Sequence, residues 1–146
     1  MSPVRAREMA QLSIKIKKCI SCGKDLQSRF SHKYCSNLCQ KNHEYNLFIK
    51  NWKTGTKSGI IGRTTYTVSR HIRKFIFDKY DSKCSRCGWF GQNVYSNKSV
   101  LEINHIDGNS KNNKESNLEL ICPNCHSLTS NFRNLNRGRG RKYRKF

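Results

Sequence analysis

The sequence predicts a small α+β protein that is held together by two zinc sites. Three features lead to this prediction: an apolar content of only 35%, eight cysteines in closely spaced pairs, and short stretches with the periodicity of helices and strands. A chain of 146 residues with this composition cannot bury a large apolar core. Small domains of that kind usually depend on disulfides or bound metals for their stability.

We expect five segments along the chain. They are a basic N-terminal segment (1–18), a zinc finger (19–45), a basic linker (46–66), a main domain (67–135) and a basic tail (136–146). Glycine, serine and threonine are frequent in the linker, as is typical of loops. The linker also contains Trp52, Ile60 and Ile61, so we expect it to dock against a folded part of the chain.

The main domain should begin with a helix over residues 68–80. Ser69 or Thr67 can cap its start. Its apolar side chains recur at helical spacing and therefore share one face. These side chains are Ile72, Phe75, Ile76 and Tyr80.

A hairpin and a second helix should follow. Residues 100–105 and 118–121 have the composition of two strands, and turn-forming residues separate them at 107–109 and 112–113. Pro123 suits the first turn of a helix. Leu128, Phe132 and Leu135 predict an apolar stripe on that helix.

Four cysteines of the main domain form two close pairs, Cys84 with Cys87 and Cys122 with Cys125. Zinc prefers four ligands in a tetrahedron, and each short pair can present two thiolates at once. We therefore predict a structural zinc site, which would be closed to water because all four positions are filled. Redox chemistry at one of the pairs is the alternative.

A second quartet, Cys19, Cys22, Cys35 and Cys39, predicts another structural zinc in a finger that is zinc-ribbon-like or treble-clef-like. His43 competes with Cys39 as the fourth ligand, and His32 does so less well. Basic residues surround the finger, so we expect it to bind DNA. A stabilising lid or a protein contact is the alternative.

The charge of the chain favours a polyanionic partner. Lysine and arginine number 29 against 9 acidic residues, which gives a formal charge of +20. Nucleic acid is the first candidate, although a highly soluble surface would give the same count. No apolar run is long enough to span a membrane. Arg5, Arg7 and Glu8 argue against a signal peptide, so we expect the cysteines to be reduced in a cytoplasm.

Two stretches near the four cysteines of the main domain carry a more specific pattern. The first runs Leu-Glu-Ile-Asn-His-Ile-Asp-Gly-Asn at 101–109, and the second runs from Asn117 to Cys-Pro-Asn-Cys-His at 122–126. A histidine at a strand end, an asparagine before the next strand and a histidine on the following helix resemble the HNH nuclease family. His105, Asn117 and His126 match that order, and the resemblance covers about residues 68–135.

The resemblance implies a ββα-metal (His-Me finger) fold and a nuclease site. His105 would be the general base, since histidine can accept a proton near neutral pH. His126 would bind a divalent ion, Mg²⁺ or Mn²⁺, and Asn117 would orient the loop that holds His105. The products would carry 5′-phosphate and 3′-hydroxyl ends.

One position departs from the family pattern. Family members usually have His or Asp just before the general base as a metal ligand, and this chain has Asn104. An amide oxygen is a neutral and weaker ligand for a hard cation. We take Asn104 and His126 as the expected metal pair. At helical spacing, Ser130, Arg133 and Arg137 share the face of His126. Arg133, and Arg137 if the helix extends that far, can bind a phosphate beside the metal.

Other interpretations of single residues stay open at this stage. His126 can replace a cysteine on the zinc, His105 can be a structural histidine, and Asp107 can be a catalytic carboxylate, although an Asp-Gly turn is simpler. The basic tail, with Arg137, Arg139 and Arg141, can track a DNA backbone, bind RNA, or simply be solvated.

The sequence as a whole favours a metal-dependent endonuclease acting on double-stranded DNA. One active site per chain would nick, and a homodimer would allow double-strand cleavage. The setting resembles phage or mobile-element homing endonucleases in a bacterial or phage-infected host, and restriction endonucleases are the alternative. The main alternative is a non-catalytic zinc-finger protein that binds nucleic acid. An RNA-directed nuclease and a protein-interaction module are further alternatives.

Overall fold

A computed structural model of the chain describes residues 17–26, 33–61 and 67–136. It divides into two compact units, Met1–Glu44 and Tyr45–Phe146. Helix α1 (Asn37–Lys53) begins in the first unit and ends in the second. The sequence analysis did not predict this 17-residue helix, because its apolar residues do not form a clear stripe and glycine follows soon after its end.

The first unit contains a tight turn that is closed by backbone hydrogen bonds. Lys18 and Asp25 form an isolated antiparallel bridge. Inside it, the Cys19 N–H donates to the Lys24 carbonyl at 2.8 Å and the Gly23 N–H donates to the Cys19 carbonyl at 2.8 Å. Gly23 has a φ of +75°, which L-residues other than glycine adopt at a cost. This turn presents Cys19 and Cys22 on the same side of the chain.

In the second unit, helix α2 (Arg70–Lys79) forms as expected. The Ser69 hydroxyl accepts a hydrogen bond from the Ile72 N–H at 3.2 Å, which identifies Ser69 as the cap. Ile72 and Ile76 are fully buried, and Phe75 and Tyr80 are partly buried against the core. Strands β1 (Ile60–Ile61) and β2 (Thr67–Val68) pair just before the helix.

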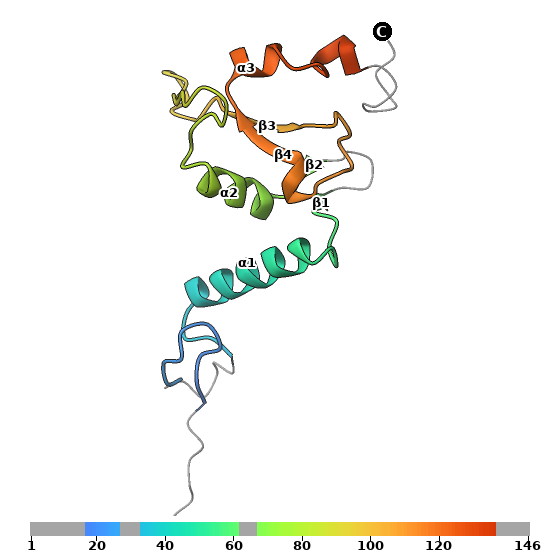
Figure 1. The fold of residues 1–146 in the computed structure, drawn as a ribbon. Coiled ribbons are helices and arrows are strands. Elements are labelled where there is room, and N and C mark those ends of the chain that lie inside the picture. Colours follow the sequence, from blue (N-terminus) through green and yellow to red (C-terminus); the bar gives the residue numbers. More distant parts are fainter. Residues whose placement is uncertain (1–16, 27–32, 62–66, 137–146) are drawn as a thin grey trace, which may run out of the picture. The chain divides into compact units, whose positions relative to one another are not determined.

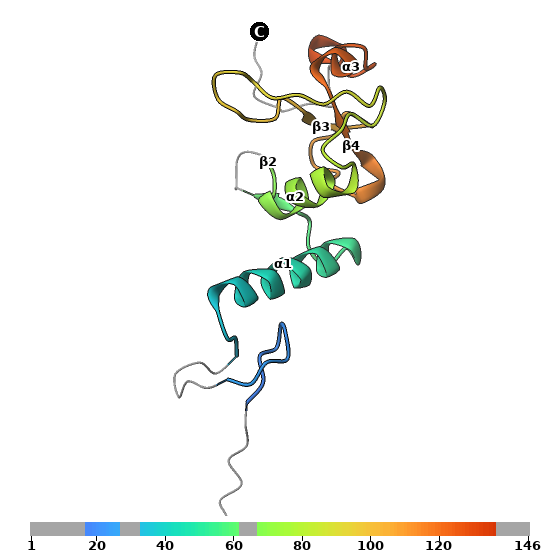
Figure 2. The same cartoon turned by 90° about the vertical axis from the view of Figure 1, so that its left-hand side faces the viewer.

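Strands β3 (Glu102–His105) and β4 (Leu118–Ile121) form an antiparallel hairpin at the centre of this unit. The register pairs Asn104 with Glu119 and His105 with Leu118. Figures 1 and 2 both show the hairpin between α2 and the short helix α3 (Pro123–Ser127). The predicted first strand was two residues too long at its start. The hairpin itself and the position of β4 are confirmed.

The core lies between α2, β4 and the end of α1. Nine buried side chains form it, two of them cysteines: Trp52, Ile72, Ile76, Leu101, Leu118, Leu120, Ile121, Cys84 and Cys122. All four residues of β4 are buried. The cysteines therefore sit at the edge of the same core that holds the hairpin in place.

The final helix is shorter than predicted. Pro123 does occupy its first turn, but α3 ends at Ser127, and a 3-10 turn (Arg133–Asn136) follows separately. The Thr129 hydroxyl donates to the His126 carbonyl at 2.8 Å and so caps the end of the helix. Leu128 is 82% exposed, so the predicted apolar stripe from Leu128 to Leu135 is wrong. Among the described residues, no helix is both long and apolar enough to cross a membrane.

Candidate active site and metal centres

The four cysteines of the main domain come together as one group. Their sulfur atoms all lie within 4.8 Å of one another. A tetrahedral zinc with Zn–S bonds of about 2.3 Å requires sulfurs roughly 3.8 Å apart. The Sγ atoms of Cys87 and Cys122 are 3.8 Å apart. The group can hold a metal ion, and its four thiols suit zinc. His126 is not part of this group.

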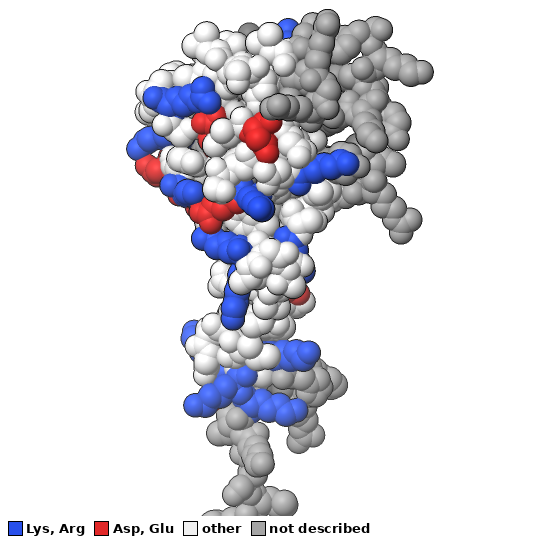
Figure 3. Space-filling view, turned by 45° about the vertical axis from the view of Figure 1, so that its right-hand side comes forward, with Lys and Arg blue, Asp and Glu red and all other residues white. Residues whose placement is uncertain are grey.

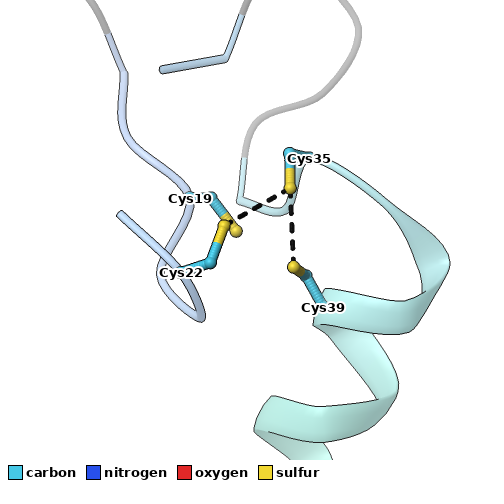
Figure 4. Close-up of side chains that lie close together, drawn as sticks. All are labelled: Cys19, Cys22, Cys35 and Cys39. Carbon is cyan, nitrogen blue, oxygen red and sulfur yellow. Dashed lines mark hydrogen bonds between the residues drawn. The ribbon is translucent and has the colours of Figure 1, made fainter. Parts of the chain in front are cut away.

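The cysteines of the first unit form a similar group. Figure 4 shows the side chains of Cys19, Cys22, Cys35 and Cys39 turned toward one another. The sulfur of Cys35 lies 3.5 Å from that of Cys22 and 3.5 Å from that of Cys39. The ring of His43 instead packs on Tyr34, at 5.6 Å between centroids. The geometry thus favours Cys39 over His43 as the fourth ligand, and His32 lies outside the described residues.

Each quartet contains one cysteine that ionises easily. Burial raises the pKa of Cys19, but backbone hydrogen bonds from Cys35, Cys22 and Ser21 outweigh it and lower the pKa to about 6. Cys84 behaves in the same way, with its pKa also lowered to about 6. Hydrogen bonding to Cys39 raises the pKa of Cys35 to about 12. A zinc ion would displace the remaining thiol protons of such a group and bind the thiolates.

His105 ends strand β3 and is held from two sides. Its Nε2 atom lies 2.8 Å from the side-chain oxygen of Asn113. Its backbone carbonyl accepts a hydrogen bond from the Asn131 amide at 2.7 Å. The ring is partly buried. Side chain and backbone of His105 are thus both fixed by asparagines from later in the chain.

Asn117 is buried beneath the loop that follows His105. Its side-chain oxygen accepts from the Asp107 N–H at 3.0 Å, and its amide donates to the Asn112 carbonyl and to the Asp107 carboxylate, both at 2.8 Å. These bonds tie the two ends of the loop together. Two of the three run from the Asn117 side chain to backbone atoms of the loop, and the third runs to the Asp107 carboxylate.

The carboxylate of Asp107 forms hydrogen bonds that stabilise its own loop. Its carboxylate accepts hydrogen bonds from the Asn109 N–H at 2.8 Å and from the side chains of Asn112 and Asn117. Burial raises the pKa of Asp107, and these hydrogen bonds outweigh it, so the pKa lies below its usual range. The contacts favour the turn interpretation of Asp107 over a catalytic carboxylate.

His126 lies on α3 and faces strand β3. Its Nδ1 donates a hydrogen bond to the carboxylate of Glu102. Its ring packs edge-on against Phe132, with centroids 5.2 Å apart. Since Nδ1 is occupied, Nε2 is the nitrogen that is left to bind a metal ion.

Asn104 is buried on the same strand as Glu102, two residues along, so the two side chains share one face of β3. The Asn104 amide donates to Glu119 Oε1 at 2.8 Å, which leaves the amide oxygen as its ligand atom. Arg86 holds Glu119 through two bonds, at 2.6 and 3.1 Å. Because Glu102 contacts His126, Asn104 and His126 belong to the same side of the hairpin.

This arrangement coincides with a match to known proteins. A family model described as HNH endonuclease matches residues 84–132. Residues 84–132 form an HNH endonuclease domain. Its limits enclose the four cysteines of the main domain, the hairpin, His105, Asn117 and His126.

A curated protein also resembles part of the chain. The H-N-H endonuclease F-TflIV of Escherichia phage T5 is 43% identical over 60 residues, which is 39% of this chain and 24% of that protein. The chain thus matches about a quarter of the length of this relative. No solved structure matches the chain.

Three residues that support the HNH histidines were missed by the sequence analysis: Glu102, Asn113 and Asn131. The alternation of strand residues offers a signal for Glu102, because it places Glu102 on the face of Asn104. Asn113 and Asn131 reach His105 through loops, and no periodic pattern in the sequence points to them.

Of the arginines predicted to bind phosphate, only Arg133 lies among the residues that the structure describes. α3 ends before Ser130, so the argument that Ser130 and Arg133 share the helical face of His126 is wrong. Arg133 is exposed, has a φ of +46°, and its guanidinium lies 5.1 Å from the centre of the Phe132 ring. The Phe132 ring thus contacts both Arg133 and His126. Arg137, Arg139 and Arg141 lie outside the described residues.

The acidic side chains of the second unit are all engaged within it. Asp78, Asp81, Glu115 and Glu119 form ion pairs with lysine or arginine, Glu102 binds His126, and Asp107 binds its loop. On the face shown in Figure 3, the acidic groups of this unit lie among basic ones. Basic residues outnumber acidic ones in the chain by 29 to 9, which favours an anionic partner.

Proposed function

We propose that the chain is a metal-dependent DNA endonuclease of the HNH type that hydrolyses phosphodiester bonds. One observation carries the proposal: two histidines on adjoining elements each have one ring nitrogen engaged by a neighbouring side chain. These contacts are His105 with Asn113 and His126 with Glu102. Such contacts orient imidazoles for proton transfer or metal binding, and they lie inside the matched HNH region.

In this proposal the domain has the ββα-metal arrangement, formed by β3, β4 and α3. His105 accepts the proton of the attacking water through Nδ1. Asn117 keeps the loop after His105 in shape, and Asn113 and Asn131 support His105 itself. Each of these residues acts through its position, and only His105 exchanges a proton.

His126 and Asn104 offer donor atoms of a kind that suits a divalent cation. His126 Nε2 and the Asn104 amide oxygen would hold it, and phosphate or water oxygens would complete its coordination. When bound, Mg²⁺ or Mn²⁺ supplies positive charge for the phosphate and the leaving oxygen. Glu102 keeps the His126 ring turned toward that position.

Double-stranded DNA is the proposed substrate. The chain's charge of +20 favours a polyanion, and the phage relative is named as an endonuclease. Arg133, with Arg137, Arg139 and Arg141 beyond the described part, would contact phosphates. The two cysteine quartets would each hold a structural zinc, and the finger at 19–45 would add DNA affinity.

We further propose that the protein acts as a phage homing endonuclease in the cytoplasm of a bacterial or phage-infected cell, where thiols stay reduced. One domain carries one site, so a single chain would nick, and a homodimer would cut both strands. We propose that the chain has five segments with separate roles, which are 1–18, 19–45, 46–66, 67–135 and 136–146.

The second candidate is a zinc-finger protein that binds nucleic acid without cutting it. Asn104 favours this candidate, because it offers a neutral ligand where the family pattern has His or Asp. The two candidates share their charge and zinc sites. Only the endonuclease would cleave DNA, so a cleavage assay distinguishes the two candidates.

The test is to incubate the zinc-loaded full chain with phage genomic DNA and with RNA of equal length, each with Mn²⁺ or with a chelator. We expect Mn²⁺-dependent fragments from DNA alone, with 5′-phosphate ends that a ligase can rejoin. Tight, salt-sensitive binding of DNA with no cleavage in Mn²⁺ would support the binding protein instead. Preferential cleavage of RNA would contradict the DNA assignment.

A further inference from the structure

We propose that Asn113 is a positioning residue for His105, which it holds so that Nδ1 is the nitrogen that accepts the proton, and that Trp52 of α1 locks Asn113 in place. The inference rests on the proposed function, because it assigns a role within the same site. The HNH pattern includes neither residue, and the sequence itself indicates only a turn at Asn113 and packing at Trp52.

The contact between Asn113 and His105 determines which ring nitrogen carries the hydrogen. Oδ1 of Asn113 lies 2.8 Å from Nε2 of His105. An amide oxygen can only accept a hydrogen bond, so Nε2 must be the donor in the neutral ring. Nδ1 then carries the lone pair, and that nitrogen is the one available as a base.

Asn113 is itself held by the core. It is only 3% exposed, and its backbone carbonyl accepts a hydrogen bond from the Trp52 indole at 2.7 Å. Trp52 is 5% exposed and packs edge-on against Phe75 at 5.5 Å between centroids. Gly59 lies so close to the indole that a Cβ added at this glycine would be 3.2 Å from Trp52. The backbone on that side therefore limits movement of the indole. The last turn of α1 thus supports His105 through one intermediate residue.

Stability alone does not explain an asparagine at position 113. Its Nδ2 is buried and makes no hydrogen bond to any residue that the structure describes. A buried donor without a partner destabilises the folded state, and an apolar side chain of similar shape would avoid that loss. What the asparagine side chain supplies is the oxygen that faces His105.

The neighbouring Asn112 offers a matched control. Its side chain donates to the Asp107 carboxylate at 2.6 Å, and its carbonyl accepts from Asn117. Replacing Asn112 by leucine therefore removes an amide from the same loop without removing the partner of the His105 ring. A general loosening of the loop should appear in both variants, whereas loss of the His105 contact should appear only at Asn113.

The experiment uses the zinc-loaded full chain with ¹⁵N-labelled histidine rings, at a pH where imidazole is neutral. Spectra that correlate ring nitrogens with ring hydrogens identify the protonated nitrogen, and the signal that disappears in His105→Gln belongs to His105. We expect a single tautomer with a hydrogen on Nε2 that exchanges slowly with solvent. This signal should persist in Asn112→Leu, weaken in Trp52→Phe and be lost in Asn113→Leu.

Turnover provides the second measurement. We expect kcat of Asn113→Leu to fall roughly ten- to hundredfold with little change in KM, because a misplaced general base slows only the chemical step. Asn113→Asp keeps an oxygen acceptor and should retain the Nε2–H signal.

The wild-type spectrum can overturn the inference even if the leucine variant does not fold, because a hydrogen on Nδ1 would contradict it. A slow Nε2–H signal that survives in folded Asn113→Leu would contradict it as well. The spectra need no DNA, so they test the contact separately from the endonuclease proposal, which fails only if the wild type does not cut.

Discussion

The carboxylate of Glu102 accepts a hydrogen bond from Nδ1 of His126, which joins the first residue of β3 to α3. The contact turns the imidazole so that Nε2 faces away from the carboxylate. Partners of this kind orient metal-binding histidines and raise their basicity. A surface-exposed glutamate thereby becomes part of the proposed metal site.

Replacing Glu102 by alanine should weaken metal binding. We expect the Mn²⁺ concentration for half-maximal nicking to rise roughly ten- to hundredfold, since the ring of His126 loses its partner. Glu102→Gln keeps an acceptor oxygen and should lose less. The measurement is a titration of nicking rate against Mn²⁺. An unchanged Mn²⁺ requirement in Glu102→Ala would show that Glu102 does not support His126.

Replacing Asn104 by aspartate should strengthen metal binding and destabilise the metal-free protein. The new carboxylate loses the hydrogen bond to Glu119 and faces a second negative charge, at a cost of about 1–3 kcal/mol. Bound Mn²⁺ should restore this stability, so Mn²⁺ should raise the melting temperature of Asn104→Asp more than that of the wild type.

The control for this experiment is Asn124→Asp, which adds the same charge at an exposed position of α3. Thermal melts with and without Mn²⁺ measure the difference. Equal shifts in the wild type and in Asn104→Asp would mean that residue 104 does not contact the ion.

The two cysteine quartets should be separable by mutation. Cys84→Ser should remove one zinc per chain and unfold the HNH domain, because Cys84 belongs to both the quartet and the core. Cys19→Ser should also remove one zinc but leave the second unit folded, since Cys19 belongs to the first unit. Zinc analysis and circular dichroism are the measurements. A Cys84→Ser protein that stays folded and retains both zinc ions would refute the structural site.

Glu115 should contribute stability that depends on pH. Burial raises its pKa, but hydrogen bonds from Lys79 and Lys53 outweigh it, so the folded-state pKa lies below the usual value. Its contribution is therefore fully present above the unfolded pKa of about 4.3 and is lost as the pH falls through the lower folded value.

Glu115→Gln should thus lower the stability at pH 7 by up to about 1 kcal/mol, with the difference from wild type disappearing in acid. Denaturant melts across this pH range measure it. Asp81→Asn is the control, because the Asp81–Lys83 pair is more exposed and links neighbouring residues only. A difference at Glu115 that stays constant down to the acid limit would contradict the assigned pKa shift.

The sequence predicted the elements whose signals are local. Ser69 as a cap, the buried face of α2, strand β4 and Pro123 in the first turn of α3 all follow from spacing or from single-residue preferences. The cysteine pairs also signal their own grouping, because ligand spacing is visible in the sequence.

The contacts that support the histidines could not be predicted in this way. Trp52 reaches Asn113 across 61 positions of sequence, and Asn131 reaches His105 across 26. Such contacts depend on how loops close in three dimensions. The end of α3 was missed for a related reason, since Leu128 and Leu135 suggest a helical stripe while the Thr129 hydroxyl terminates the helix at the His126 carbonyl.

The most direct test of the central claim is nicking of supercoiled plasmid by the zinc-loaded full chain with Mn²⁺, compared with His105→Ala. Loss of the general base should slow nicking by roughly a hundredfold or more, with zinc content, melting temperature and DNA affinity nearly unchanged. His71→Ala, which removes a histidine packed on Phe48, is the control and should still nick. Mn²⁺-dependent nicking at the wild-type rate by folded His105→Ala would contradict the account.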